Sequence, residues 1–358
     1  MFRLRGSQLP IRPPIDLMRI LQVGNAQMRR WGKARVSTEH KLYNGLIRNF
    51  HHVLHFSDRD MAAFLAPFKL RDLGRGRVNR KLIEVADNFQ PEMILLGHCD
   101  LIRNKTLDEI RKLLPDVRIA YRNVDPLFVP HNVEAIHRRK SAVDTIFITT
   151  AGKALDPFKD SRAEVFYMPN PTDEAVENLN NWEKSADELP YDLFFCGNSN
   201  EHTERKKTVV ALKEAFEGSE VNFKAFGYFG EPNVWGRDYD AVLAKSKIGL
   251  NLNRQEGDYL YSSARLAQLM GNGIVPVIHR AGRMETLLGE GHAIYFSDRK
   301  ELIKKVRELQ LDNDRRIAIA RAGQDFYRKH FCSARVADFI VNRAMKPARS
   351  RDFIWAGL

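Results

Sequence analysis

The sequence predicts an α/β protein of two doubly wound domains that face one another across a cleft. Short apolar runs alternate with amphipathic stretches in both halves of the chain, a pattern typical of parallel sheets covered by helices. This alternation is interrupted once, over residues 172–190, and then restarts. A chain of 358 residues is also too long for one ordinary hydrophobic core.

In the first half, apolar runs predict strands and amphipathic stretches predict the helices between them. We expect strands at 18–24, 53–56, 91–100, 117–125, 143–152 and 163–171. We expect helices at 38–50, 82–89, 108–114 and 132–140, with a basic, glycine-containing segment at 69–81 before the second helix. Since helices connect successive strands, the sheet is expected to be parallel.

The second half repeats this pattern. Strands are expected at 191–200, 222–230, 248–252 and 274–278, with one more ending at 296. Helices are expected at 205–217, 239–244, 302–309, 315–330 and 334–345, with one more after the polar loop 253–258. Ser262 and Ser263 can cap the helix that follows loop 253–258, and Asn272-Gly273 can close it.

These elements divide the chain into four parts. Residues 1–171 form an N-terminal Rossmann-like domain that begins with a basic leader at 1–17, and residues 172–190 form an acidic, polar linker. Residues 191–331 form a C-terminal Rossmann-like domain, and residues 332–358 form a helical tail that closes the chain.

Composition excludes several classes of protein. A hydrophobic content of 44% with 10% aromatic residues is enough for two packed cores, so we do not expect a disordered chain. The sequence contains no apolar run long enough to span a membrane. Cys99, Cys196 and Cys332 are widely separated and match no disulfide framework or metal motif. Reduced thiols in the cytoplasm are therefore expected.

The net charge of +12 leaves several partners open. A basic protein can simply have a solvated surface, or it can bind an anionic substrate, an anionic membrane surface or nucleic acid. The sequence has no zinc-finger, RRM or KH signature, so we do not expect nucleic acid. One loop near the N-terminus is basic. It could equally be solvated or contact an anionic acceptor or lipid headgroup, and its cationic residues are Arg29, Arg30, Lys33 and Arg35.

The best candidate site from mechanism alone is the start of the helix after loop 253–258. A helix that starts beyond the carboxyl end of a parallel strand directs its first N–H groups at bound anions. The sequence therefore predicts a nucleotide or phosphate site there, although the two serines can be no more than caps.

Several stretches of the sequence resemble a known protein family. CGNSN, FGYFG, SKIGLNLNR and ARLAQLMGNGIVPVIH occur in an order similar to that of the C-terminal domain of GT-B-fold glycosyltransferases. They look most like the group-1-like branch that includes the CgeB-type proteins, as does the ending of the domain, GHAIYFSDRKELIKKVRELQLDNDRRIAIARAGQDFYRKHF. In the first half, MILLGHCDL and VRIAYRNVDPLF resemble the acceptor-domain strands of that family.

The resemblance implies transfer of a sugar from a nucleotide-activated donor on the C-terminal domain to an acceptor on the N-terminal domain. The nucleotide-sugar is a substrate, and no cofactor or metal is implied, since cationic side chains and helix N-termini can stabilise the leaving diphosphate. Asp58 and Asp60 have the spacing of a metal-binding DxD motif, but coincidence is the better reading because they lie in the presumed acceptor domain.

The chain departs from the family pattern in two places. Many relatives carry a glutamate three residues after the helix arginine, which holds the donor ribose, and here Gln268 follows Arg265 at that position. The paired glutamates of many retaining enzymes are absent from the C-terminal half, so the stereochemistry of transfer is not implied.

Candidate donor-binding residues lie at the ends of the C-terminal-domain strands and at the start of the following helix. They are Gly197, Asn198, Ser199, Tyr228, Asn253, Arg254, Ser262, Ser263 and Arg265. Each has a plainer reading as a turn residue, an aromatic turn, a solvated arginine or a helix cap. Gly271 and Gly273 are expected to be structural.

Asp125 and His98 are the candidate catalytic residues, because both stand at the carboxyl ends of N-terminal-domain strands and could deprotonate an acceptor hydroxyl. Asp125 precedes a proline and could instead form a turn. Glu39 and His40 are the alternatives for the same role.

The sequence thus predicts a metal-independent glycosyltransferase, located in the cytoplasm or at the periphery of the inner membrane. Its partners would be a nucleotide-sugar and a glycan or lipid-linked acceptor of surface polysaccharide or lipopolysaccharide synthesis. The alternative is a non-catalytic relative that binds nucleotide or glycan, which Gln268 favours. A nucleic-acid-modifying enzyme is suggested by charge alone.

Overall fold

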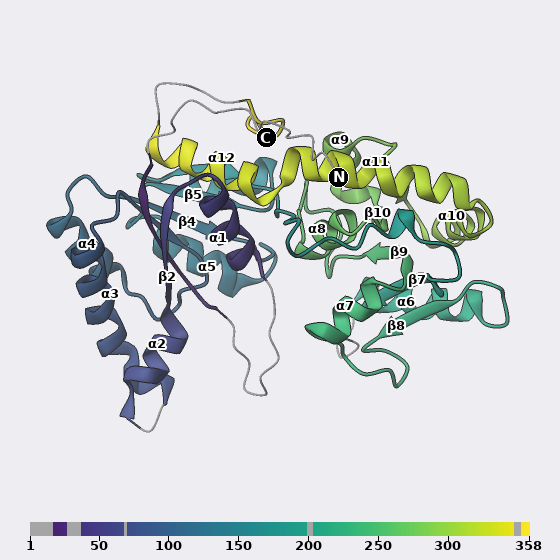
Figure 1. The fold of residues 1–358 in the computed structure, drawn as a ribbon, viewed down its shortest axis with the longest axis horizontal. Helices are drawn as coiled ribbons and strands as arrows, with labels where there is room; N and C mark the ends of the chain where they lie inside the picture. The colour runs from purple at the N-terminus through teal and green to yellow at the C-terminus, as the bar shows by residue number, and fades with distance from the viewer. Residues whose placement is uncertain (1–16, 27–36, 68–69, 199–202, 347–351) are drawn as a thin grey trace, which may run out of the picture.

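The protein consists of two α/β units packed side by side, each built on a parallel sheet (Figure 1). The computed structural model describes residues 17–26, 37–67, 70–198, 203–346 and 352–358. This arrangement confirms the predicted fold class of two Rossmann-like domains.

The first sheet has the strand order β2-β1-β3-β4-β5-β6, with every neighbouring pair parallel. Its strands are β1 (Arg19–Gly24), β2 (His52–Ser57), β3 (Met93–Leu96), β4 (Arg118–Asn123), β5 (Thr145–Ile148) and β6 (Glu164–Tyr167). The connections contain α1 (Thr38–Arg48), α2 (Asp58–Leu65), η2 (Arg71–Gly74), α3 (Arg75–Phe89), α4 (Asn104–Leu113), α5 (Pro130–Arg139) and η3 (Gly152–Phe158). Because the strands are parallel, all their carboxyl ends lie at one edge of the sheet.

Helix α3 begins seven residues earlier than the sequence indicates. The prediction placed its start at Leu82, but the structure starts it at Arg75, inside the basic segment. Val78, Leu82 and Ala86 form one buried face at helical spacing. The exposed arginines between them obscure this periodicity in the sequence.

The second sheet has the order β11-β10-β9-β7-β8 and is also parallel. Its strands are β7 (Tyr191–Cys196), β8 (Phe223–Phe226), β9 (Ser246–Asn251), β10 (Val275–His279) and β11 (Ile294–Phe296). Its helices are α6 (Glu204–Phe216), α7 (Arg237–Leu243), α8 (Ala264–Gly271), η5 (Arg280–Gly282), α9 (Glu285–Leu288), α10 (Arg299–Leu311) and α11 (Asn313–Phe331). Gly249 in β9 lets α8 approach closely, because a Cβ there would lie 2.3 Å from Leu269 Cδ2.

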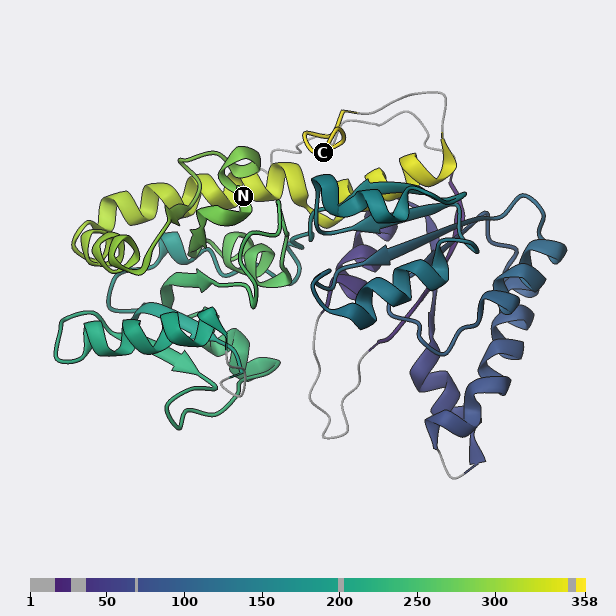
Figure 2. The same cartoon turned by 180° about the vertical axis from the view of Figure 1, so that it is seen from behind.

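The chain returns to the first domain at its end. Helix α11 packs on the second domain, and α12 (Ser333–Met345) continues along the top of the molecule to pack against α1 (Figures 1 and 2). The contact is close because a Cβ at Gly45 would lie 2.1 Å from the Ser333 carbonyl oxygen. Trp355 is fully buried against Phe331 and Phe339, so residues beyond α12 cover its outer side.

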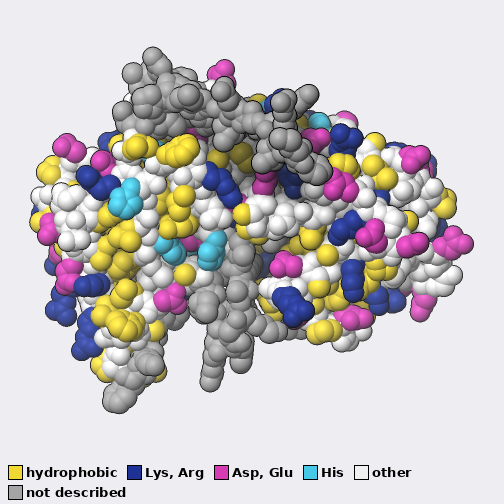
Figure 3. Space-filling model, viewed as in Figure 1, with side chains coloured by type: hydrophobic (Ala, Val, Ile, Leu, Met, Phe, Trp, Pro, Cys, Tyr) yellow, Lys and Arg dark blue, Asp and Glu magenta, His cyan; other side chains and the backbone are white. Residues whose placement is uncertain are grey.

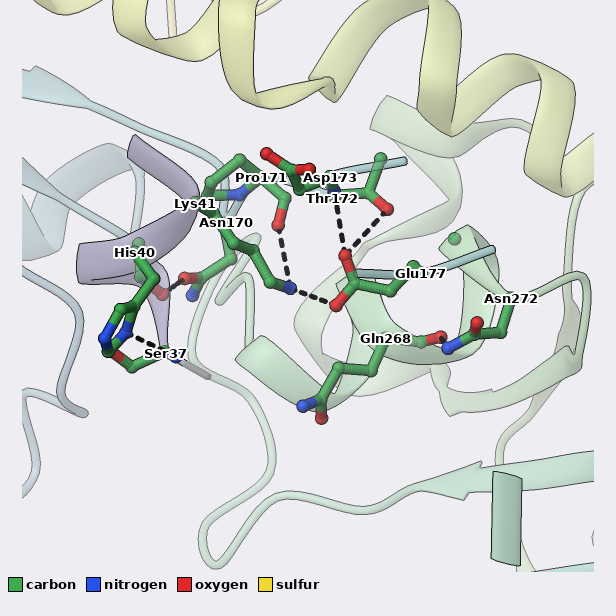
Figure 4. A network of polar contacts seen from close by, with 12 residues as sticks. Ser37, His40, Lys41, Asn170, Pro171, Thr172, Asp173, Glu177, Gln268 and Asn272 are labelled. Carbon is green, nitrogen blue, oxygen red and sulfur yellow. Dashed lines mark hydrogen bonds and ion pairs between the residues drawn. The ribbon is translucent and has the colours of Figure 1, made fainter. Parts of the chain in front are cut away.

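The segment from 170 to 181, which includes the start of the predicted linker, is a packed junction between the domains (Figure 4). Lys41 of α1 forms a buried ion pair with Glu177 and donates to the Pro171 carbonyl over 3.3 Å. Thr38 donates to the Asn170 side chain at 2.5 Å. The polar side chains at the start of the predicted linker are thus buried and paired, and the linker assignment itself stays a prediction.

Among the residues that the structure describes, no helix is both long and apolar enough to cross a membrane.

Candidate active site

A cleft of about 1040 Å³ separates the carboxyl edges of the two sheets. One wall comes from the ends of β3 and β4 and the start of α1. The other wall comes from the ends of β7 and β9, the start of α8 and the segment before α7. Eight of the predicted site residues line it: His98, Asp125, Gly197, Asn198, Asn253, Arg254, Ser263 and Arg265.

Arg265 joins the ends of two strands on the C-terminal wall. Its guanidinium donates to the Leu252 carbonyl at 2.9 Å and the Cys196 carbonyl at 3.1 Å, and lies 4.8 Å from the centre of the Phe195 ring. These contacts hold a positive charge at the cleft wall in a fixed position. Part of the role of Arg265 is therefore structural.

The N-terminal end of α8 opens on the same wall. Ser263 is the N-cap, and its hydroxyl accepts from the Leu266 N–H at 3.2 Å and donates to Asn251 at 2.8 Å. Ser263, Ala264 and Arg265 all line the cleft. The partial positive charge of a helix N-terminus is thus available there to an anionic ligand.

Ser262 lies at the domain junction and not among the residues that line the cleft. Its hydroxyl accepts from the Asn170 backbone N–H at 2.9 Å, and its carbonyl accepts from the Asn170 amide at 2.5 Å. Its own N–H donates to the Thr149 carbonyl at 2.8 Å. The sequence shows two serines before a helix but does not distinguish the cap from the bridge.

The loop after β9 carries Asn253 and Arg254, and both residues line the C-terminal wall of the cleft. The Arg254 guanidinium lies 5.9 Å from the ring centre of Phe128, which belongs to the opposite domain. Glu256 accepts from the Asn253 N–H at 3.0 Å, and burial raises the pKa of Glu256 to about 7. The exposed Arg254 is the predicted arginine that is best placed to meet a phosphate.

Tyr228 does not line the cleft. Only 3% of its surface is exposed, and its hydroxyl donates to the Asn198 carbonyl at 3.2 Å. The nearby turn depends on Gly227, which has φ +83°, and a Cβ there would lie 1.9 Å from the Gly197 carbonyl oxygen. Tyr228 therefore supports the turn that carries Gly197 and Asn198.

Sequence reasoning did not select the segment before α7. Trp235 of that segment lines the cleft, as does Asp238 in the first turn of α7. The hydroxyl of Tyr239, also in α7, donates to Gln268 Oε1 at 3.2 Å. That bond orients the Gln268 amide, which Figure 4 shows directed away from Glu177. Arg205, at the start of α6, also lines the cleft. In the sequence, only the clustered charged and aromatic residues of these segments could have identified them as part of the site.

The N-terminal wall carries the two candidate catalytic side chains. His98 Nδ1 lies 3.6 Å from Asp125 Oδ2, and the two side chains are 33% and 42% exposed. The Asn123 amide donates to the Asp125 carbonyl at 2.9 Å and fixes the turn after β4. The pair can therefore reach a ligand in the cleft.

Glu39 is held in a buried ion pair with Arg122 and accepts a second bond from Gln22. Its carboxylate fits between the ends of β1 and β3, because a Cβ at either Gly24 or Gly97 would lie 2.3 Å from Glu39 Oε2. Glu39 therefore organises the cleft floor. Its neighbour His40 bonds Ser37 and does not line the cleft.

Five predicted contacts lie outside the described residues: Arg29, Arg30, Lys33, Arg35 and Ser199. Within the described part of the chain, no group of three histidine, cysteine, aspartate or glutamate side chains is placed to hold a metal ion. Asp58 is fully buried at the start of α2, and Asp60 accepts from Ser57.

Two parallel α/β domains that face one another across such a cleft define the GT-B fold class. Residues 205–342 match the family model described as Glycosyl transferase-like, which covers most of the second domain and α12. No curated protein sequence matches the chain significantly. The predicted resemblance to GT-B glycosyltransferases is thus confirmed, while the CgeB-type branch stays a prediction.

Solved structures share the whole architecture. HepE from Anabaena, in complex with UDP and glucose, is 12% identical with a TM-score of 0.59, over 92% of this chain and 100% of that one. An α,α-trehalose-phosphate synthase (UDP-forming) from Burkholderia vietnamiensis is 12% identical with a TM-score of 0.60, over 92% and 100%. A glycosyltransferase from Rickettsia africae is 9% identical with a TM-score of 0.60, over 93% and 100%. At these identities the likeness concerns the fold.

Proposed function

We propose that the protein is a glycosyltransferase that moves a sugar from a nucleoside-diphosphate donor to a hydroxyl acceptor. One observation carries the proposal: a single cleft has a cationic wall with a helix N-terminus on one domain and a histidine–aspartate pair on the other. The family match of residues 205–342 and the UDP and glucose in the HepE complex support a nucleotide-sugar as the donor.

The donor diphosphate would lie against the C-terminal wall. Arg254 and the first turn of α8 would bind its oxygens, while Arg265 adds fixed positive charge behind them. When the bond from the sugar C1 to the phosphate oxygen breaks, the electron pair leaves with the diphosphate. Preorganised positive charge stabilises that developing negative charge without requiring a metal ion.

The acceptor would lie against the N-terminal wall. His98 takes the proton of the attacking hydroxyl as its oxygen bonds to C1, and Asp125 stabilises the imidazolium that forms. Both side chains are exposed enough to meet a substrate.

The biological setting is a finer part of the same proposal. The acceptor would be a glycan or a lipid-linked glycan of surface polysaccharide or lipopolysaccharide synthesis, at the cytoplasmic side of a membrane. The net charge of +12 supports an anionic acceptor or lipid surface.

A thermal-shift panel of UDP, GDP, ADP, dTDP and CMP tests the donor site. We expect one nucleoside diphosphate to raise the melting temperature, and Arg254→Ala to remove that rise. Lys300→Ala is the matched control, because Lys300 is an exposed cation of the same domain on α10. Failure of every nucleotide to stabilise the protein would remove the basis for the donor site. Stabilisation without turnover would favour the non-catalytic relative, which Gln268 also favours.

A further inference from the structure

The first domain ends in a projecting tip whose side chains the proposed chemistry does not use. It is formed by the end of α2, by η2 and by the first turns of α3, and lies at the lower left of Figure 1. We define the basic tip by its described side chains: Phe64, Leu70, Leu73, Arg75, Arg77 and Arg80.

Three large apolar side chains of the basic tip are left in solvent. Phe64 is 80% exposed, more than any other large hydrophobic residue of the described chain, and Leu73 and Leu70 are 59% and 57% exposed. Scattered exposed leucines need no explanation, but a phenylalanine with two leucines on one small projection forms an apolar surface.

Three exposed arginines follow this apolar surface, on the first turns of α3. Arg75, Arg77 and Arg80 are all exposed, and none forms an ion pair with a carboxylate of the described residues. Arg77 donates to the Leu65 carbonyl at 2.6 Å, which ties the arginine to the end of α2. Figure 3 shows hydrophobic and Lys/Arg side chains side by side at this end of the molecule.

We propose that the basic tip docks on a bilayer that contains anionic lipid. Phe64 and Leu73 would enter the headgroup region, while the arginines contact lipid phosphates. Apolar side chains with cations on the adjoining helix combine the two contributions that hold a protein at such a surface, burial of apolar area and attraction to anionic headgroups. Nucleic acid would match the cations but leave the leucines exposed to water.

The basic tip is linked to the wall that carries His98. Arg59 of α2 forms an ion pair with Asp100, and Arg75 donates to the Asp100 carbonyl at 3.1 Å. Asp100 lies two residues after His98 in the same loop. Helix α2 also starts at the carboxyl end of β2, the sheet edge that borders the cleft. Docking would therefore hold the acceptor wall close to the bilayer. This benefit for the transfer reaction rests on the proposed function.

Vesicle flotation with the full chain tests the docking. The vesicles contain phosphatidylcholine alone or with 30 mol% phosphatidylglycerol, an amount of about one lipid in three that mimics an anionic leaflet. We expect binding to the anionic vesicles that falls at least fivefold without phosphatidylglycerol. Phe64→Ser and Arg80→Glu should each weaken it by about fivefold or more, in line with the loss of one anchoring group.

Leu311→Ser is the matched control, because Leu311 is 77% exposed on α10 of the other domain. It should bind vesicles as the unsubstituted protein does. Both tip side chains are exposed, so unchanged melting temperatures verify that the variants fold. Equal binding to neutral vesicles, unchanged binding of both tip variants, or an equal loss in Leu311→Ser would each overturn the proposal. The assay contains no nucleotide, so its result is independent of donor binding.

Discussion

His98 and Asp125 follow neighbouring parallel strands, and their side chains approach to 3.6 Å at the wall of the cleft. The pairing follows from topology, since β3 and β4 end at the same edge of the sheet. Neither side chain is buried, so the pair is accessible to an acceptor.

This relationship predicts a separation of catalysis from donor binding. His98→Ala should lower kcat by about 10²–10⁴ because the hydroxyl proton loses its base. Asp125→Asn should lower it less, since the imidazole remains. Donor affinity, measured by calorimetry, should stay within about twofold for both variants, because the donor wall belongs to the other domain. A His98→Ala enzyme with normal kcat would remove His98 from the mechanism.

Gly271 is predicted to be the glycine of α8 that cannot carry a side chain. An added Cβ would lie 2.0 Å from Thr172 Oγ1 and 2.7 Å from Glu177 Cβ, both in the buried junction. Gly271→Ala should therefore lower the free energy of unfolding by roughly 1–3 kcal/mol. Gly76→Ala is its control, because no atom beyond the neighbouring residues and the backbone of its own helix lies within 4 Å of the added Cβ there. Urea unfolding of both variants measures the difference, and equal stabilities would contradict the packing of the junction.

The ion pair between Lys41 and Glu177 should be costly to break on one side only. Both side chains are nearly fully buried, so Glu177→Gln leaves the Lys41 ammonium without its countercharge. We expect a loss of about 3 kcal/mol in the free energy of unfolding.

The double variant Lys41→Met/Glu177→Gln should recover part of that loss. The exposed pair Lys304–Glu308 supplies the control, and Glu308→Gln should cost less than about 0.5 kcal/mol. Denaturant titrations of the four proteins give these energies. A Glu177→Gln protein as stable as Glu308→Gln would show that the junction does not depend on the pair.

Glu256 should make stability depend on pH near neutrality. Burial raises its pKa to about 7, the Asn253 N–H and Arg265 oppose that rise, and the charge of Asp258 adds to it. In the unfolded chain the pKa of a glutamate is about 4.3. Between these values the folded protein holds a proton that the unfolded chain has lost, so the contribution is present at low pH and disappears as pH rises through 7.

Unfolding free energies measured from pH 5 to pH 8 test this dependence. The unsubstituted protein should lose stability relative to Glu256→Gln as the pH rises, because glutamine does not titrate. Parallel curves for the two proteins would mean that Glu256 is ionised across the range.

The sequence predicts most of the scaffold because buried parallel strands have a strong local signature. MILL at β3 and YDLFFC at β7 are apolar runs flanked by polar turns, and both form strands at the predicted places. The alternation with helices predicts the two sheets. The cap at Ser263 follows from its position before the apolar face of α8.

Long-range polar pairing is what the sequence does not reveal. Asp173 and Glu177 belong to the polar segment that is predicted to be a linker. The sequence does not show that both are buried, where they pair with Arg48 and Lys41, more than 120 positions earlier. Ser262 likewise bonds Asn170, 92 residues away. No local periodicity carries such contacts.

Release of nucleoside diphosphate from a nucleotide-sugar tests the central claim most directly. Using the donor whose nucleotide stabilises the protein, we expect release above background, faster with an acceptor hydroxyl present. Arg254→Ala should reduce it at least tenfold, by loss of a charge-assisted phosphate contact. Release no faster than that of Arg254→Ala, from a donor that binds, would contradict sugar transfer and leave a nucleotide-binding protein.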